Sequence, residues 1–234
     1  MRVGAAFPDP PFEVAGDPPS GFDVELMHAI ARELDRTWEL HRYDGADFDG
    51  IFAGLGERYD VVASGATVTD HRRTLARWCN PYLQSGQSLV VDVHRTPGVR
   101  SKDDLADLVL GVQKGNTSEP VARRLHADGK VNDVRIYAYD EILGALDDLE
   151  AGTIGAFMKL EPVMRWLTAQ RPSLEVVETG ITRELIAVAV GFGDERLAAA
   201  INEAQRAVRD RGDLDRFGRR WLDDNDPKAT VVVA

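Results

Sequence analysis

The chain has 234 residues, of which 44% are hydrophobic and 29% charged, an ordinary balance for a globular protein. This length accommodates one large domain or two smaller lobes. A formal net charge of −11 argues against a nucleic-acid partner, because nucleic-acid binders carry basic patches. The single cysteine, Cys79, excludes an intramolecular disulfide and indicates no metal cluster. We expect it to be a small buried hydrophobic residue, with a nucleophilic role as the minor alternative.

No apolar run approaches the roughly 20 residues that a membrane-spanning helix needs. No signal-peptide pattern precedes the first predicted strand, which begins at Arg2. A mature protein trimmed of its leader, a domain cut from a larger receptor and a cytoplasmic protein all remain compatible with this start. A start placed at the first strand is typical of a trimmed domain.

The first third of the chain alternates strand and helix patterns. Asp23 is a plausible N-cap for a helix that runs to Asp35, with an apolar stripe formed by residues four apart. This βαβαβ order predicts a mostly parallel sheet with helices on both faces. The predicted strands are 2–7, 37–42 and 59–64, and the predicted helices are 23–35 and 48–56.

The rest of the chain repeats this plan and then returns with one strand and two helices. The pattern therefore predicts an α/β protein with two sheet clusters. A polar tail at 223–228 is expected to be loosely held. The predicted strands are 88–93, 109–113, 135–139, 154–159 and 185–190, and the predicted helices include 141–151, 162–168, 195–211 and 213–221.

The segment Ala66–Thr74, with the sequence ATVTDHRRT, follows the buried strand that begins at Tyr59. It places two hydroxyls and Arg72 just past the end of that strand, where ligands bind in open α/β sheets. A guanidinium is a planar, always-charged fork that binds a carboxylate through two bonds. A carboxylate ligand at Arg72 is therefore predicted, and an exposed arginine at a helix start is the alternative.

Further motifs fall in the order typical of one family and cover nearly the whole chain. The chain resembles the amino-acid-binding type of bacterial extracytoplasmic (periplasmic) solute-binding proteins of family 3, which serve ABC transporters. The motifs that carry this resemblance are Pro11-Phe-Glu13, Gly21-Phe-Asp-Val-Glu25, Phe48-Asp49, Thr67-x-Thr69 with Arg72, Pro81-Tyr82, Gly111-Val-Gln-x-Gly115 and the closing Gly212…Trp221 helix.

The resemblance implies the type II periplasmic-binding-protein fold, with two α/β lobes joined by two hinge strands. Lobe 1 is expected to comprise residues 1–88 and 187–234, and lobe 2 residues 89–186. It further implies a receptor that captures an amino acid or related organic acid by hinge closure, located in the periplasm or outside the cell, with an ABC permease as a possible partner. No enzymatic activity, cofactor or metal is implied.

The resemblance also assigns residues to the ligand's α-carboxylate. Arg72 is implied to clamp it, with help from the Thr67 hydroxyl and the backbone near Gly65. Thr117 is implied to add a hydroxyl from the second lobe, within a turn where Asn116 replaces a threonine. Backbone N–H groups at a helix N-terminus attract anions, which fits this turn. A capping role for Thr117 is the alternative, and both can hold.

The chain departs from the family where the ligand's ammonium is bound. Leu160 stands at the position of the usual aspartate, and Gly155 replaces another. An ammonium buried without an anionic partner is strongly unfavourable. Either Glu161 or Asp9 therefore supplies the negative charge, or the ligand lacks a free α-amine. Asp9 could equally be a turn residue between prolines, and Glu161 could cap the following helix.

Aromatic residues and one lysine complete the predicted site. Phe12 and Phe48 are candidate walls of the ligand pocket, with core packing as the alternative for each. Lys159 could add positive charge, although strand alternation would then direct Leu160 to the other face.

The sequence leaves two alternatives to a binding receptor, one enzymatic and one not. Some relatives on this fold dehydrate cyclohexadienyl acids such as prephenate or arogenate, and Glu161 would be the general acid here. The third possibility is a ligand-sensing or protein-interaction module.

Overall fold

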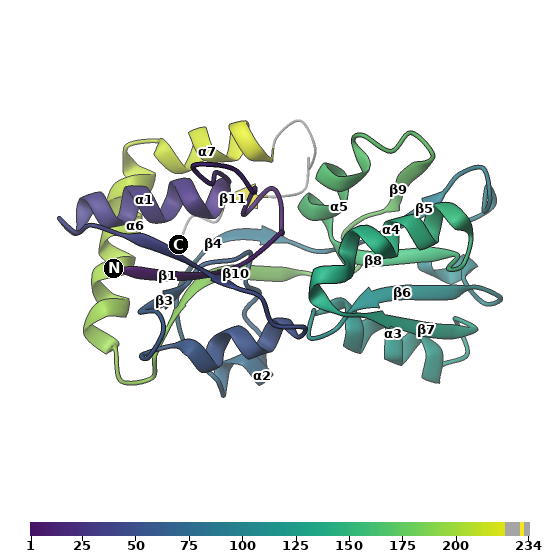
Figure 1. Cartoon of the computed structure of the whole chain (residues 1–234), viewed down its shortest axis with the longest axis horizontal. Helices are drawn as coiled ribbons and strands as arrows, with labels where there is room; N and C mark the ends of the chain where they lie inside the picture. Colours follow the sequence, from purple (N-terminus) through teal and green to yellow (C-terminus); the bar gives the residue numbers. More distant parts are fainter. Residues whose placement is uncertain (223–229, 232–234) are drawn as a thin grey trace. The chain divides into compact units, whose positions relative to one another are not determined.

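The computed structural model describes residues 1–222 and 230–231, which form two compact units (Figure 1). Unit 1 comprises residues 1–44, residues 49–85 and the chain from Glu184 on. Unit 2 comprises residues 45–48 and 86–183. The chain thus changes unit three residues before each predicted boundary. Residues 45–48 join unit 2 because the Phe48 N–H donates to the Lys114 carbonyl (3.3 Å) and the Tyr139 N–H to that of Ala46 (3.0 Å).

The described part of unit 1 contains a six-stranded sheet in the order β11-β4-β10-β3-β1-β2. Strands β2, β1 and β3 are parallel, whereas β10 pairs antiparallel with both β3 and β4. The predicted parallel βαβαβ arrangement is therefore only half of a mixed sheet. The strands are β1 (Arg2–Ala6), β2 (Glu39–Tyr43), β3 (Val61–Val62), β4 (Arg77–Ser85), β10 (Glu184–Val190) and β11 (Thr230–Val231).

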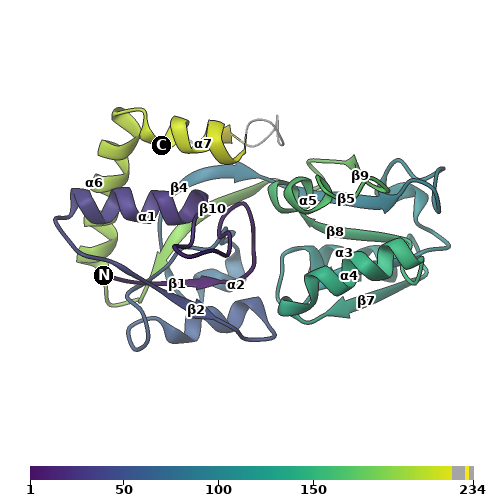
Figure 2. The same ribbon diagram turned by 45° about the horizontal axis from the view of Figure 1, so that its top comes forward.

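Helices cover this sheet on both faces. The helices α1 (Phe22–Glu33), α6 (Glu195–Asp210) and α7 (Asp213–Trp221) pack against one another. Figures 1 and 2 show α1 and α7 on one side of the sheet, and the 3₁₀ helix η1 (Phe48–Gly54) with the short helix α2 (Asp70–Arg73) on the other.

Two local predictions in unit 1 are wrong. No strand is predicted at residues 77–85, where the structure has β4, and proline within a strand is unusual because it lacks a donor for the ladder. Pro81 is accommodated beside the register shifts of the β4–β10 pair. Helix α1 begins at Phe22 after Gly21, whose φ of 132° few other residues adopt, so Asp23 is not its N-cap.

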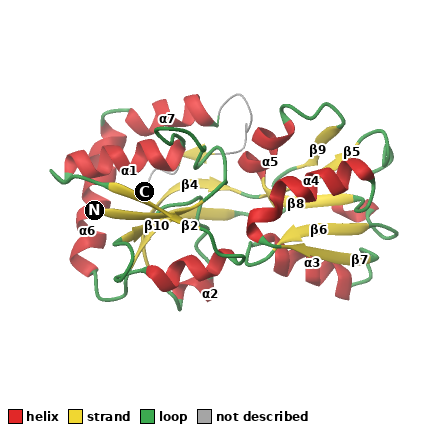
Figure 3. Cartoon of the chain, in the orientation of Figure 1, coloured by secondary structure: helices red, strands yellow, loops and turns green. Residues whose placement is uncertain are grey.

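Unit 2 contains a five-stranded sheet in the order β7-β6-β8-β5-β9. Strands β7, β6 and β8 are parallel, and β5 pairs antiparallel with β8 and β9 (Figure 3). The edge strand β9 was not predicted. The elements are β5 (Gln87–Asp92), η2 (Lys102–Asp104), β6 (Val109–Gln113), α3 (Ser118–Ala127), β7 (Asp133–Tyr137), η3 (Tyr139–Glu141), α4 (Ile142–Ala151), β8 (Ala156–Leu160), α5 (Glu161–Thr168) and β9 (Leu174–Glu178).

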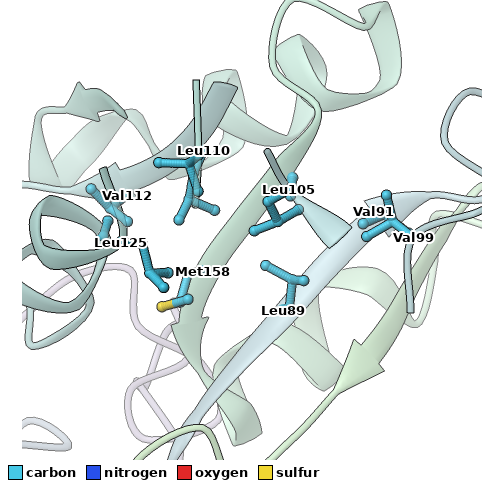
Figure 4. Close-up of a cluster of buried hydrophobic side chains, with 11 residues drawn as sticks. Leu89, Val91, Val99, Leu105, Leu110, Val112, Leu125 and Met158 are labelled. Atoms are coloured by element: carbon cyan, nitrogen blue, oxygen red, sulfur yellow. The ribbon is translucent and has the colours of Figure 1, made fainter. Parts of the chain in front are cut away.

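Alternation along the unit-2 strands builds a dry core on one face of the sheet. Leu110 and Val112 of β6 are two residues apart and point to the same side, as do Leu89 and Val91 of β5. Leu125 of α3 closes this cluster, which Figure 4 shows with Leu105 and Met158. The core therefore fixes which residues of β6 and β8 face away from it.

In each unit the parallel strands end at one edge of the sheet. The chain continues from those edges into the predicted site residues: Asp9 after β1, Gly65 to Arg72 after β3, and Gly115 to Thr117 after β6. This is where parallel α/β sheets bind ligands.

Among the described residues, none of the helices combines the length and hydrophobicity needed to cross a membrane. The predicted tail at 223–228 lies outside the described residues.

Replacing a core leucine tests the packing of unit 2. We expect Leu110→Ala to lower the free energy of unfolding by about 2–5 kcal/mol, because it removes buried methyl groups and leaves a cavity. Leu143 is 50% exposed, and Leu143→Ala should change stability by less than about 0.5 kcal/mol. Urea unfolding followed by circular dichroism compares the two, and equal effects would contradict the assigned core.

Candidate functional site

Arg72 is a buried cation with fixed geometry. Its side chain is 4% exposed, its Nε donates to Asp49 Oδ1 at 2.7 Å, and its Nη1 donates to the Thr67 carbonyl at 3.1 Å. The guanidinium also lies 5.7 Å from the centre of the Phe52 ring. These contacts hold the planar group in one orientation before any ligand binds, which lowers the ordering cost of binding. The alternative of an exposed surface arginine is excluded by this burial.

Thr67 is also buried, but its hydroxyl has a partner within the protein. Thr67 Oγ1 donates to Glu184 Oε2 at 2.6 Å, and its backbone bridges Ile186. A hydroxyl has one proton, so in this arrangement Thr67 does not donate to a ligand through its side chain. The predicted hydroxyl contact therefore requires that proton to turn away from Glu184.

Gly65 sits in a backbone conformation that glycine permits, with φ of 53°. Its N–H donates to Asp23 Oδ2 at 2.7 Å, and a side chain at this position would lie 2.6 Å from the Phe12 ring. Asp23 thus holds the loop at Gly65 and does not cap helix α1. Phe12 is fully buried and its ring lies against Gly65. This favours core packing over the predicted role as a wall of the ligand pocket.

Three buried carboxyl groups, on Asp9, Glu13 and Asp23, gather in the same part of unit 1. The Asp9 carbonyl accepts the N–H groups of Phe12 and Glu13, as expected for a turn residue. Burial, together with the negative charge of Asp9, raises the pKa of Asp23 to about 7, against the lowering effect of the Gly65 N–H and the Tyr82 hydroxyl. We call Arg72, Asp49, Thr67, Gly65 and Asp9 the unit-1 cluster.

In unit 2, the turn Gly115–Thr117 leads directly into α3. Gly115 has φ of 73°, and a side chain there would come within 2.1 Å of Asp47 Oδ1 and 2.8 Å of the Phe48 nitrogen. Its N–H donates to Glu119 Oε2 at 2.9 Å. One of the backbone N–H groups expected to bind the ligand is therefore bonded to a carboxylate of the chain itself. The Thr117 side chain makes no capping bond to the helix. Its hydroxyl accepts from Gln87 Nε2 at 2.9 Å instead.

Several side chains connect this turn to the ends of the neighbouring strands. The Lys159 ammonium donates to Gln113 Oε1 at 2.8 Å and lies 5.2 Å from the centre of the Tyr139 ring. Asn116 Nδ2 donates to the same Gln113 oxygen at 3.3 Å. Phe48 packs on Tyr139 with ring centres 5.4 Å apart. We call Phe48, Gln113, Asn116, Thr117, Tyr139 and Lys159 the unit-2 cluster.

Glu161 is engaged by its own helix. It is 1% exposed, and its Oε1 accepts from Arg165 Nε at 2.9 Å and from Arg165 Nη2 at 2.8 Å. A general acid must carry a proton, whereas pairing with a guanidinium favours the charged carboxylate. This geometry opposes the dehydratase alternative, in which Glu161 would be the acid.

Cys79 and metal binding offer no further chemistry among the described residues. Burial raises the pKa of the Cys79 thiol to about 12, which disfavours the thiolate that a nucleophile needs and opposes the nucleophilic alternative. Within residues 1–222, no cluster of three or more histidine, cysteine or acidic side chains could hold a metal ion.

The sequence profile of the bacterial extracellular solute-binding proteins, family 3, matches residues 1–224. The chain belongs to this family. Its two mixed α/β units are the type II fold that the sequence motifs predicted, and its family consists of binding proteins rather than enzymes.

Individual relatives are similar over nearly the whole chain. The L-cystine-binding protein TcyJ of Escherichia coli (strain K12) is 27% identical over 226 residues, covering 95% of this chain and 82% of the relative. An ancestral arginine-binding protein bound to arginine has a TM-score of 0.86 and 29% identity, covering 95% of this chain and 98% of its own. An ancestral amino acid-binding protein, described as a precursor of cyclohexadienyl dehydratase, has a TM-score of 0.84 and 26% identity, covering 95% of this chain and 95% of its own.

The predicted site residues divide between the two units. Arg72, Thr67, Gly65, Phe12 and Asp9 lie in unit 1, whereas Phe48, Asn116, Thr117 and Glu161 lie in unit 2. The residues that hold them were not predicted as site residues from the sequence: Asp49, Glu184, Asp23, Gln87, Gln113, Glu119 and Tyr139. Asp49, Asp23 and Gln113 stand in the quoted motifs, although no pattern indicated their partners, and Glu184, Gln87, Glu119 and Tyr139 fall outside those motifs.

The raised pKa of Asp23 predicts a pH-dependent stability. The folded protein keeps this proton up to about pH 7, whereas the unfolded chain releases it at about pH 4. The stabilisation is therefore present below about pH 4 and lost as the pH rises through 7, a change of about 4 kcal/mol. Asp23→Asn stays neutral, so we expect it to gain stability relative to the parent between pH 4 and pH 8. Urea unfolding at both pH values measures this, with exposed Asp44→Asn as control, and a pH-independent difference would contradict it.

The crowding at Gly115 predicts an unequal cost for two glycine substitutions. Gly129 has φ of 68° with nothing within 4 Å of an added side chain, so Gly129→Ala should cost about 1–2 kcal/mol from backbone strain alone. Gly115→Ala also collides with Asp47 and the Phe48 backbone and should cost about 1–3 kcal/mol more. Equal losses of unfolding free energy in the two variants would contradict close packing of residues 47–48 against this turn.

Proposed function

We propose that this protein is a receptor that captures a small carboxylate-bearing ligand, an amino acid or a related organic acid, for uptake by an ABC transporter. The observation that carries the proposal is Arg72, a buried guanidinium at the carboxyl end of β3, oriented by Asp49 and by the Thr67 carbonyl. The relatives' names support the ligand class, since they describe binding of cystine and arginine.

The Arg72 geometry favours an anion for a physical reason. A buried charge is costly unless its donors are satisfied, and a carboxylate matches the fork of a guanidinium. Asp49 is bonded through Nε, and its side chain is 25% exposed, so Arg72 belongs to a partly hydrated ion pair rather than to a sealed core. This arrangement suits a cation that recognises an incoming carboxylate.

The hinge-closure mechanism is part of this proposal. The resemblance implies that one ligand binds Arg72 and Thr117, which belong to different units. A ligand that needs both residues stabilises whichever arrangement of the units lets both reach it, and its affinity for that arrangement drives the change. Delivery to a permease and a location in the periplasm or outside the cell follow from the same proposal.

A ligand panel tests the proposal. Amino acids, their deaminated analogues and prephenate are screened by thermal shift, and hits are measured by isothermal titration calorimetry. A ligand at 100 times its dissociation constant stabilises the protein by about 2.7 kcal/mol, which is readily seen. We expect at least one carboxylate hit and no turnover of prephenate.

The decisive variant is Arg72→Ala, with the exposed neighbour Arg73→Ala as the matched control. Arg72→Ala should weaken the hit by about a hundredfold or more, because it removes one partner of a buried charged pair. It should also lower the melting temperature slightly, since Asp49 loses its ion pair. Arg73→Ala should bind as the parent does. Unchanged affinity in Arg72→Ala, or silence across the panel, would contradict the proposal and favour a protein-interaction module.

A further inference from the structure

We propose that Glu184 determines the specificity of the ligand site in unit 1, because it fixes the direction of the Thr67 hydroxyl. Thr67 Oγ1 is thereby left as a hydrogen-bond acceptor, and the ligand places an N–H donor beside the carboxylate that Arg72 binds. This inference rests on the proposed function and names the ligand class within it, a carboxylate with an N–H group on the adjacent carbon. Every contact on which it depends lies within unit 1.

The hydrogen bond between Thr67 and Glu184 has a fixed direction. Thr67 Oγ1 lies 2.6 Å from Glu184 Oε2, and the two residues are 4% and 6% exposed. A carboxylate only accepts hydrogen bonds, so the single hydroxyl proton lies between the two oxygens. The lone pairs of Oγ1 then accept a donor from the ligand, whereas a carboxylate oxygen finds no proton there.

Backbone pairing holds the two residues side by side. Glu184 is the first residue of β10, and Thr67 forms an antiparallel bridge with Ile186 of the same strand. The next residue along the loop, Val68, donates its N–H to the Leu185 carbonyl at 2.8 Å. This pairing uses backbone groups alone, so replacing either side chain leaves the two backbones in place.

Arg72 brings the carboxylate of a ligand close to this hydroxyl. Its Nη1 donates to the Thr67 carbonyl at 3.1 Å, so the guanidinium and the Thr67 side chain border the same part of the loop. In an α-amino acid the nitrogen and the carboxylate are attached to one carbon, and the two groups match a guanidinium and a neighbouring acceptor. A ligand with a carboxylate alone leaves the buried Thr67 oxygen without a donor, which is unfavourable.

The competing interpretation is the one that the family resemblance implied, in which Thr67 donates to the ligand carboxylate. It requires the hydroxyl proton to leave Glu184, so a buried carboxylate loses a charge-assisted hydrogen bond when the ligand gains one. It predicts that an amine on the ligand gains no bond at Thr67. The two interpretations therefore differ in the order of ligand affinities.

Pairs of ligands that differ only in the amine separate the two interpretations. Calorimetry compares arginine with 5-guanidinopentanoate, glutamine with 4-carbamoylbutanoate, and leucine with 4-methylpentanoate. In every pair that binds measurably, we expect the amino acid to bind at least about tenfold more tightly, because its deaminated partner gives the Thr67 oxygen no donor.

Variants at both ends of the hydrogen bond test whether Glu184 causes this preference. Glu184→Met removes the acceptor and releases the Thr67 proton toward the ligand carboxylate, and Thr67→Val removes the hydroxyl. Each should fold, as checked by thermal melting, and lower the ratio of the two affinities by about tenfold or more. Other contacts of Glu184 affect both ligands of a pair alike, so the ratio isolates this hydrogen bond.

Two further variants serve as controls. Thr67→Ser restores the hydroxyl and should recover the preference that Thr67→Val loses. Glu203→Met makes the same replacement at an exposed position of α6. It should change both affinities by less than about twofold, since a screened surface charge contributes little.

Each outcome supports or overturns the inference. A ratio that falls in both Glu184→Met and Thr67→Val supports it. Deaminated ligands that bind as tightly as the amino acids overturn it and leave the proposed function standing, and so does a ratio that survives either variant. Failure of every carboxylate to bind at millimolar concentration overturns the inference and the proposed function together.

Discussion

Parallel pairing of three strands in each unit is the constraint on which the rest of this structure depends. Parallel strands send their carboxyl ends to one edge, and the connections that leave that edge are free to carry polar side chains. In unit 1 the chain leaves β3 into the loop that holds Gly65 and Arg72. In unit 2 the ends of β6, β7 and β8 bring together Gln113, Tyr139 and Lys159, which are far apart in sequence.

Buried charged groups are stabilised by different partners in the two units. Arg72 is neutralised by Asp49 and is thereby fixed in direction. Lys159 is held by an amide oxygen and lies beside an aromatic ring. Burial, with a smaller contribution from the like charge of Asp9, raises the pKa of Asp23, so this carboxyl reduces the cost of burial by holding a proton. Each of these groups is oriented by neighbours that come from other elements of the same unit, and for Arg72 that orientation makes recognition of a carboxylate chemically reasonable.

The family resemblance and the individual residues carry different weight. The order of motifs along the chain anticipated the family and the fold, both of which are confirmed. The roles of the site residues stay predictions, and the structure changes their relative merit. The ion pair between Glu161 and Arg165 opposes a general-acid role for Glu161. The Thr67 hydroxyl donates its hydrogen bond to Glu184. The Lys159 ammonium donates to Gln113, a residue to which the sequence motifs assigned no role.

The sequence by itself determined the α/β class, most helices and strands, the family and the position of Arg72. These features are local, since apolar periodicity and short motifs record which residues face a core and which follow a strand. Only the tertiary structure decided that β4 exists despite Pro81, that Asp23 anchors Gly65, and that Lys159 meets Gln113. Those outcomes depend on pairing between segments separated by 42 residues for Asp23 and Gly65, and by 46 for Lys159 and Gln113. Such pairing is set by the packing of whole strands and helices, and no local pattern in the chain records it.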